Sequence, residues 1–249
     1  ANLKRQLGNN QEAAVLYKRA VQADPQLVQA YVGAAASFLA LGDLDQAETF
    51  AAQALAINAR TPGANETVGI VCQNRSKPDQ AIECYQMEIE VNPEARTSLL
   101  NLGFLFLQKG QTAAAVESLA KASTLAPSKQ CSLLLAQAYQ NLGQFKEAIV
   151  EYKKVDIDQA KNKMIPFNLG RCLLSTGNNS DAIEAFKLAV RLDESFIPAW
   201  GNIGTALINE GRHQEALPVT QKVLELAPNN ATAHMNLGIV YKDLGNLDQ

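Results

Sequence analysis

A period of about 34 residues runs through this chain and limits what it can fold into. Alanine recurs at spacings of 34 residues, with a single spacing of 33, at Ala13, Ala47, Ala81, Ala115, Ala148, Ala182 and Ala216. A small residue precedes each alanine by five positions, and the same series continues to the chain end: Gly8, Gly42, Ser76, Gly110, Gly143, Gly177, Gly211 and Gly245. A regular period of this length predicts an array of stacked units in place of one globular core.

Each unit has the pattern of two amphipathic helices joined by a tight turn. In the unit around Gly110, apolar residues recur at spacings of three and four on both sides of the glycine. A second series of small residues keeps the same period: Ala35, Gly69, Gly103, Ala136, Gly170, Gly204 and Gly238. Aromatic residues make up 6% of the chain and β-branched residues form no alternating runs, so we expect an all-α fold.

The glycine, alanine and proline residues at fixed positions of each unit fit this interpretation. Glycine in the turn can adopt a positive φ and end the first helix, and the recurring alanine allows two helix backbones to approach closely. Proline stands one or two residues past the expected second helix at Pro25, Pro93, Pro127 and Pro228. Ser76 replaces a turn glycine, so we expect an atypical turn at 74–78, with Pro78 in the first turn of the next helix.

These residues resemble the tetratricopeptide repeat family, whose pattern is Leu-Gly in the first helix, an aromatic residue three positions later, the turn glycine, alanine, a second aromatic residue, alanine and proline. The first aromatic position holds Phe38, Phe106, Tyr139 and Tyr241, and the second holds Tyr17, Tyr85, Tyr152 and Phe186. The resemblance implies a right-handed superhelical solenoid of helix-turn-helix repeats.

A single array over 1–249 is therefore expected. With residue 28 as the first position, the full repeats are 28–61, 62–95, 96–128, 129–162, 163–196 and 197–230. Residues 1–27 and 231–249 hold partial repeats, and arrays of this kind end in a polar capping helix, so we expect a fragment of a longer array. Pro218 predicts a bend near Gln214 to Leu217, and the irregular stretch 156–163, followed by Pro166, predicts a local change in superhelical pitch.

Composition and motifs exclude several classes of function. The net charge of -3 argues against nucleic acid as a partner, and the longest nearly apolar stretch, 31–41, is about half of the ~20 residues that cross a bilayer. Four cysteines lack a C-x-x-C pair, so we expect buried thiols in a reducing compartment and a cytoplasmic protein. They are Cys72, Cys84, Cys131 and Cys172.

Catalytic, cofactor and metal sites are not predicted within these residues, so we do not expect an enzyme here. No phosphate-binding glycine loop, nucleophile elbow or H-E-x-x-H motif occurs. His213 and His234 are expected to be structural. Paired carboxylates such as Asp43 with Asp45 and Glu88 with Glu90 are expected at turns or on solvated helical faces.

The resemblance also implies a binding surface, because the first helix of each unit lines the concave side in this family. One groove position holds asparagine in four of seven units, at Asn101, Asn168, Asn202 and Asn236, and Gly33, Thr67 and Leu134 in the others. A carboxamide can accept from a peptide N–H and donate to a C=O, so a row of them could hold an extended main chain. This resembles the asparagine ladder of O-linked N-acetylglucosamine transferases.

Neighbouring groove positions are mostly apolar or amide. Phe104, Gln137, Asn141, Arg171 and Asn209 complete the candidate peptide-binding residues. For the four asparagines, the alternative to ligand binding is that they follow repeat consensus or bond to neighbouring helices. For Phe104 and Phe167, the alternative is burial between units.

We therefore expect a protein-protein interaction scaffold that binds an extended peptide or partner segment in its groove. The alternative is a substrate-recruiting array of a larger enzyme, a glycosyltransferase or other transferase, with its catalytic domain outside these residues. Self-association through the incomplete end repeats is a third possibility.

Overall fold

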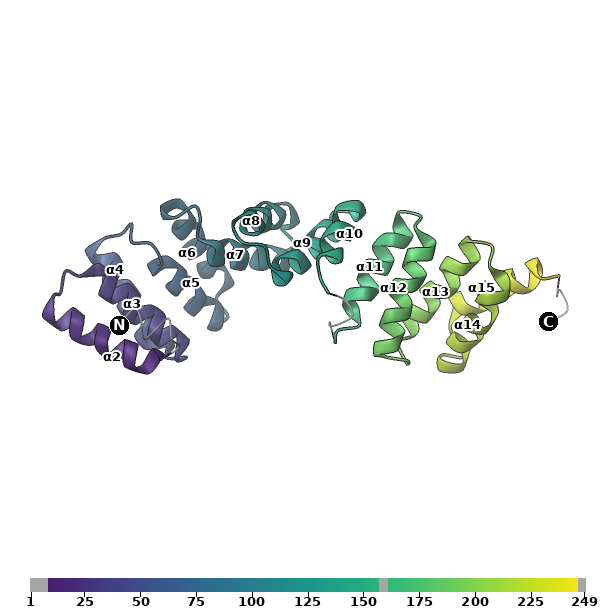
Figure 1. Cartoon of the computed structure of the whole chain (residues 1–249), viewed down its shortest axis with the longest axis horizontal. Coiled ribbons are helices and arrows are strands. Elements are labelled where there is room, and N and C mark those ends of the chain that lie inside the picture. The colour runs from purple at the N-terminus through teal and green to yellow at the C-terminus, as the bar shows by residue number, and fades with distance from the viewer. Residues whose placement is uncertain (1–8, 157–160, 246–249) are drawn as a thin grey trace. The chain divides into compact units, whose positions relative to one another are not determined.

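The computed structural model describes residues 9–156 and 161–245, and these residues form helices and connecting turns with no strand (Figure 1). The helices of the described residues are α2 (Asn10–Ala23), α3 (Val28–Ala40), α4 (Leu44–Ile57), α5 (Ala64–Asn74), α6 (Pro78–Val91), α7 (Arg96–Gln108), α8 (Thr112–Leu125), α9 (Lys129–Asn141), α10 (Phe145–Lys153), α11 (Met164–Ser175), α12 (Asn179–Leu192), α13 (Ile197–Asn209), α14 (His213–Leu226) and α15 (Ala231–Asp243). The expectation of an all-α fold is confirmed.

The helices are grouped in two compact units of several repeats each, residues 1–131 and 132–249, with the division inside α9. From here on, the first unit and the second unit mean these two groups, and a single helix pair is called a repeat. We call the odd-numbered helices first helices and the even-numbered ones second helices. Within each unit a helix packs on its neighbours in sequence, and first helices also contact one another: α3 with α5 and α5 with α7, and α11 with α13 and α13 with α15. Each unit is therefore a solenoid of stacked helix pairs.

The turn glycines from Gly42 to Gly245 adopt the left-handed conformation that the sequence predicts, with φ between 70° and 78°, and Gly8 lies outside the described residues. Ser76 has φ 58° and is the single non-glycine residue of the described chain with a positive φ. Its amide donates to Gln73 O at 3.1 Å, and Lys77 N donates to Cys72 O at 2.9 Å. The equivalent bonds of the Gly110 turn measure 3.1 and 2.8 Å. The expectation of an atypical turn at 74–78 is therefore wrong for the backbone, because serine adopts the glycine geometry.

Close helix contacts account for the recurring small residues. All seven recurring alanines have no exposed surface. A methyl group added at Gly170 would lie 2.6 Å from the ring of the fully buried Phe186, and one added at Gly69 would lie 2.6 Å from the ring of Tyr85. A first helix thus packs its glycine directly against the large side chain that follows the alanine by four positions in the second helix.

The second helices that precede a proline end where the sequence predicts, and one second helix, α10, is short. Helices α2, α6, α8 and α14 each end two residues before a proline, as predicted. Helix α10 has 9 residues whereas α12 has 14, so the second helix before the irregular stretch ends early. Residues 157–160 of that stretch lie outside the described residues. Helix α14 continues through Pro218, and the predicted bend stays a prediction.

Glu88 corrects one expectation from the sequence. It is 1% exposed and does not lie on a solvated face of α6. Its Oε1 accepts from Gly63 N at 2.7 Å and its Oε2 accepts from Glu66 N at 3.2 Å. Helix α5 begins after Gly63, which has no side chain to cap it, so a carboxylate from the next helix satisfies the free N–H groups.

The four cysteines are buried and reduced, as the sequence predicts. Burial raises the pKa of the Cys84 and Cys172 thiols to about 11, which keeps them protonated at neutral pH. In the part of the chain that the structure describes, no helix has the length and apolar character needed to cross a bilayer.

Candidate peptide-binding groove

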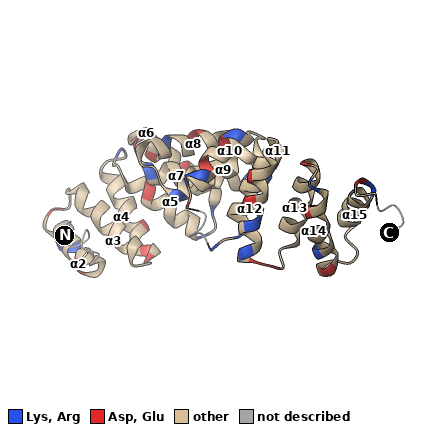
Figure 2. Cartoon of the chain, turned by 45° about the vertical axis from the view of Figure 1, so that its right-hand side comes forward, with Lys and Arg blue, Asp and Glu red and all other residues tan. Residues whose placement is uncertain are grey.

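Charge is unevenly divided between the two kinds of helix. Helices α3 and α13 contain no charged residue, and α11 contains only Arg171. Helix α12 in contrast carries Asp181, Glu184, Lys187 and Arg191, and Figure 2 shows the coloured bands of α12 beside the plain α13. First helices therefore carry mainly apolar and amide side chains, and the second helices carry most of the charge.

Asn101 is bonded to the preceding repeat. Its carboxamide nitrogen donates to the hydroxyl oxygen of Tyr85 at 3.2 Å, and that hydroxyl donates to Gln73 Oε1 at 2.9 Å. The carboxamide oxygen of Asn101 has no hydrogen-bond partner among the described residues. The bond fixes the orientation of the amide, so its nitrogen faces Tyr85 and its oxygen stays available as an acceptor.

The same arrangement recurs in the second unit. The Tyr152 hydroxyl donates to Gln140 Oε1 at 3.0 Å, and the Asn168 side chain hydrogen-bonds to that hydroxyl. Burial raises the pKa of Tyr152 to about 12, although the bond from Asn168 acts in the opposite direction. Asn101 and Asn168 therefore both bond to a tyrosine of the neighbouring second helix, which favours the alternative that the asparagines bond to neighbouring helices.

The two remaining asparagines differ from this pattern. Asn236 is 6% exposed, and its nitrogen donates to the Thr205 hydroxyl of the neighbouring first helix α13 at 3.4 Å, so it too bonds to a neighbouring helix. Asn202 follows a repeat with Phe186 in place of the tyrosine, so no hydroxyl is offered to it. Its carboxamide is half-buried and has no hydrogen-bond partner in the described part of the chain. Asn202 is therefore the ladder residue with its full hydrogen-bonding capacity free.

Four of the candidate residues line one cavity in the second unit. An open cavity of about 420 Å³ is bordered by side chains of α9, α10 and α11 and by Asn162. Gln137, Asn141, Asn168 and Arg171 meet there, together with the apolar Leu133 and Met164. The Arg171 guanidinium lies 6.0 Å from the centre of the Phe167 ring and has no ion-pair partner among the described residues. The cavity combines amides, one unpaired cation and apolar surface.

The other candidate peptide-binding residues do not line this cavity. Asn101 and Phe104 belong to α7 in the first unit, where Phe104 is half-buried against the core cluster that contains Tyr85. Asn209 is exposed at the end of α13 and lines none of the cavities described here. Phe167 is 8% exposed and packs on the Phe186 and Phe196 rings, so the expectation of its burial is confirmed.

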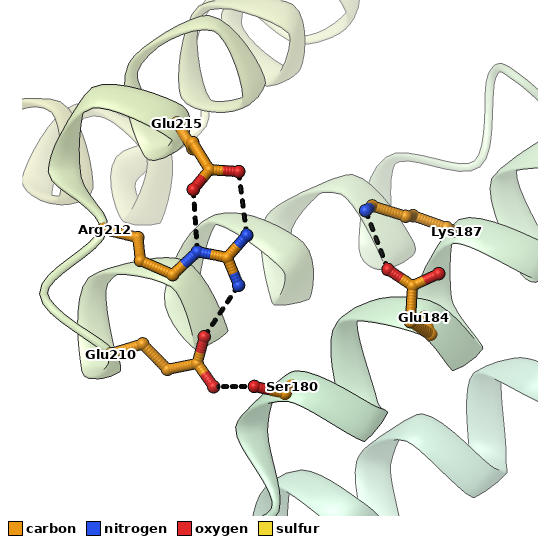
Figure 3. Close-up of polar contacts among 6 residues, drawn as sticks. All are labelled: Ser180, Glu184, Lys187, Glu210, Arg212 and Glu215. Carbon is orange, nitrogen blue, oxygen red and sulfur yellow. Dashed lines mark hydrogen bonds and ion pairs between the residues drawn. The ribbon is translucent and has the colours of Figure 1, made fainter.

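The charged groups around the turn after α13 are paired with one another (Figure 3). Arg212 forms two parallel bonds of 2.8 Å to Glu215 and a third of 2.8 Å to Glu210, which in turn accepts from the Ser180 hydroxyl at 2.5 Å. Glu215 first, and then Glu210, raise the pKa of Arg212 above its ordinary range. These charges tie α12, α13 and α14 together and leave no free cation at this turn.

Both histidines contact structural partners. His213 Nε2 lies 3.3 Å from Asp243 Oδ2, and His234 Nε2 lies 2.8 Å from Pro228 O. Trp200, one repeat earlier, donates to the carbonyl of Glu194 with the same separation of six residues, so His234 takes the place of that aromatic residue. Within the described ranges, no three His, Cys, Asp or Glu side chains are placed to hold a metal ion.

Comparison with known proteins identifies relatives of several kinds. The "Peroxisomal targeting signal receptor" of Yarrowia lipolytica is 29% identical over 96 residues, 38% of this chain and 16% of the receptor. The "Probable UDP-N-acetylglucosamine--peptide N-acetylglucosaminyltransferase SPINDLY" of Hordeum vulgare is 26% identical over 154 residues, 62% of this chain and 14% of that protein. The "Protein O-mannosyl-transferase TMTC3" of Homo sapiens is 24% identical over 246 residues, 94% of this chain and 27% of that protein. The chain spans less than a third of each.

Solved structures and family models agree on the repeat. YrrB, described as "a TPR protein with an unusual peptide-binding site", superposes with a TM-score of 0.68 at 18% identity, over 74% of this chain and 96% of YrrB. MamA superposes with a TM-score of 0.59 at 26% identity, over 67% of this chain and 92% of MamA. Two family models, both described as "Tetratricopeptide repeat", match residues 4–64 and 207–249, and residues 73–129 and 133–195. The chain belongs to the tetratricopeptide repeat family.

Proposed function

We propose that this chain is a protein-interaction scaffold that holds an extended segment of another protein along its first helices. The observation that carries the proposal is the cavity of about 420 Å³, where Gln137, Asn141, Asn168 and Arg171 meet. Ligand sites of this kind combine apolar walls with a few polar groups that fix orientation.

The amides give the groove a way to bind main chain. The carboxamide oxygen of Asn168 accepts a ligand N–H, because its nitrogen is engaged by Tyr152. Asn202, with no internal partner, both accepts and donates. Leu133 and Met164 receive apolar side chains, and Arg171 pairs with a carboxylate of the ligand.

The relatives do not favour the alternative that the repeats serve an attached catalytic domain. Matching repeats occur both in a protein named as a receptor and in proteins named as transferases. Repeats shared by such different proteins supply binding and leave the reaction to other residues. The four buried thiols fit a reducing compartment, and we propose the cytoplasm.

Selection of random 12-residue peptides on the purified chain, followed by calorimetry with the selected peptides, tests the proposal. We expect Asn168→Ala with Arg171→Ala to weaken binding about tenfold or more, since each lost bond contributes about 0.5–1.5 kcal/mol. Gln221→Ala removes the same amide from an exposed position on second helix α14 and should leave the affinity unchanged. Equal affinities for all three proteins, with intact folds by circular dichroism, would reject the groove.

A further inference from the structure

The second unit contains another cavity, at a place where one repeat lacks a ring. The residue four positions after the recurring alanine is large in most repeats, as Tyr17, Tyr85, Leu119, Tyr152 and Phe186. In α14 the same position holds Thr220. The other small residue there, Ala51, lies in a filled core with Ala35 and the Phe50 ring.

The missing ring leaves real space. A methyl group added at Gly170 would lie 2.6 Å from the Phe186 ring, but one added at Gly204 would meet its first atom, Thr220 Oγ1, at 3.4 Å. A methyl group at Gly201 would meet nothing within 4 Å. A cavity of about 230 Å³ lies between α13, α14 and α15 as a result. An apolar cavity of about 150 Å³ in another protein suffices to bind benzene.

The floor and the rim of this cavity differ in chemistry. Thr220 and Val223 on the floor are each 2% exposed, whereas Pro198 and Thr232 on the rim are exposed. The Thr220 hydroxyl donates to Ala216 O at 2.8 Å and the Thr205 hydroxyl donates to Gly201 O at 3.1 Å. Both hydroxyl protons are thus used within the helices, so these two side chains offer a ligand only their methyl groups and an acceptor oxygen.

Two of the four asparagines of the proposed ladder lie in the wall of this cavity. Asn202 and Asn236 both line the cavity, and Asn202 is the ladder residue without an internal partner. A peptide main chain held by Asn202 would therefore pass directly over the opening. A buried floor at Thr220 and Val223, with the half-buried Asn202 amide above it, suits one side chain that enters the cavity while its backbone stays outside.

We propose that this cavity is an anchor pocket for an aromatic side chain, phenylalanine or tyrosine, of the bound segment. The ligand supplies the ring that Phe186 and Tyr85 supply in other repeats. The inference deepens the proposed function, since it names the side chain that the groove selects. The anchor pocket is formed around α13, α14 and α15, so it can be tested separately from the cavity around Arg171.

Trp200 makes the pocket measurable, because it lines the cavity and is the single tryptophan of the chain. Titration of the whole chain with N-acetyl-phenylalaninamide should change Trp200 fluorescence saturably, with a Kd on the order of 1 mM for so small a ligand. N-acetyl-alaninamide at the same concentrations should cause no saturable change.

Two variants at one position give the matched control. Thr220→Phe fills the pocket from inside and should weaken probe binding at least tenfold, whereas Thr220→Val keeps the volume and should preserve it. If Thr220→Phe fails to fold by circular dichroism, Gly201→Leu obstructs the rim instead. Equal responses to both probes, or undiminished binding after the pocket is obstructed, would overturn the proposal.

A last comparison separates the pocket from the groove. Asn168→Ala with Arg171→Ala should leave probe binding unchanged, because those residues line the other cavity. Among the peptides selected on the chain, replacement of the aromatic residue by alanine should weaken binding at least tenfold on the wild type and much less on Thr220→Phe. Selected peptides without aromatic residues would contradict the pocket while leaving the groove intact.

Discussion

The Asn101 carboxamide donates its hydrogen bond to the Tyr85 hydroxyl of the preceding repeat, at 3.2 Å. The same hydroxyl donates to Gln73, so one phenol joins α5, α6 and α7. Asn168, Tyr152 and Gln140 repeat the arrangement in the second unit. A residue type that suggests ligand binding thus also holds neighbouring repeats together.

Loss of this phenol should destabilise the first unit. Tyr85→Phe keeps the ring but leaves Gln73 and Asn101 without their common partner, and we expect the free energy of unfolding to fall by about 1 kcal/mol. Urea denaturation measures the change. Asn101→Ala in the Tyr85→Phe background should cost less than in the wild type, and strictly additive effects would mean that the two side chains are not coupled.

Gly170 and Gly238 should respond oppositely to the same substitution. Gly170→Ala places a methyl group 2.6 Å from the Phe186 ring, and we expect a loss of about 1–3 kcal/mol from overpacking. Gly238 lies within α15 with nothing within 4 Å of the added methyl group, so Gly238→Ala should stabilise the protein by up to about 1 kcal/mol. Thermal unfolding followed by circular dichroism compares them, and a destabilised Gly238→Ala would contradict the open environment.

Ser76→Gly should stabilise the protein. Ser76 occupies the left-handed region at φ 58°, where a side chain costs about 1 kcal/mol relative to glycine. The hydrogen bonds of the turn are already those of the Gly110 turn, so nothing else needs to change. We expect a gain of about 0.5–1 kcal/mol in chemical denaturation. Gly110→Ser is the reverse experiment and should cost a similar amount.

Glu66 should make stability depend on pH. Burial raises the pKa of its carboxyl above 4.5, partly offset by a hydrogen bond from Ser98, and the charge of Glu88 raises it further. Between pH 4.5 and the pKa of the folded state, the folded protein binds more protons than the unfolded one, so stability falls as pH rises through that window.

The difference between wild type and Glu66→Gln isolates this effect, because other carboxylates titrate in both proteins. The variant should lose the slope that Glu66 contributes, while Ser98 still donates to its amide oxygen. NMR titration of the Glu66 carboxyl in Glu88→Gln should give a lower pKa than in the wild type, because one neighbouring charge is removed. An unchanged Glu66 pKa would show that the two carboxyls do not interact.

The fold could be predicted because the residues that end helices or allow close helix packing recur at a fixed spacing in the sequence. Turn glycines, buried alanines and prolines after second helices act locally, and their spacing places every helix pair. Tyr85 and Tyr152 also carried a usable signal, since a buried tyrosine hydroxyl requires a partner and an asparagine follows each by 16 residues. The sequence alone does not decide between this pairing and ligand binding for the asparagines.

Other features depended on contacts that spacing does not reveal. Glu88 caps Gly63 across 25 residues because α6 packs beside the start of α5, and nothing in the local pattern of α6 distinguishes it from solvated glutamates. The cavity beneath Asn202 arises from an absent ring at Thr220, and its existence depends on whether neighbouring side chains fill the space. Ala51 is also small at the equivalent position, but it is fully buried in a core cluster with Ala35 and Phe50.

The bonds to Tyr85 and Tyr152 impose a chemical polarity on the groove. An amide held by its nitrogen keeps its oxygen free, so in the proposed complex Asn101 and Asn168 would each accept a hydrogen bond from a backbone N–H of the partner. Proline has no backbone N–H and cannot satisfy them. If the proposed groove binds a main chain in this way, a proline or an N-methylated residue opposite either asparagine should weaken binding whatever its side chain, and partner segments should carry such residues out of register with these two positions.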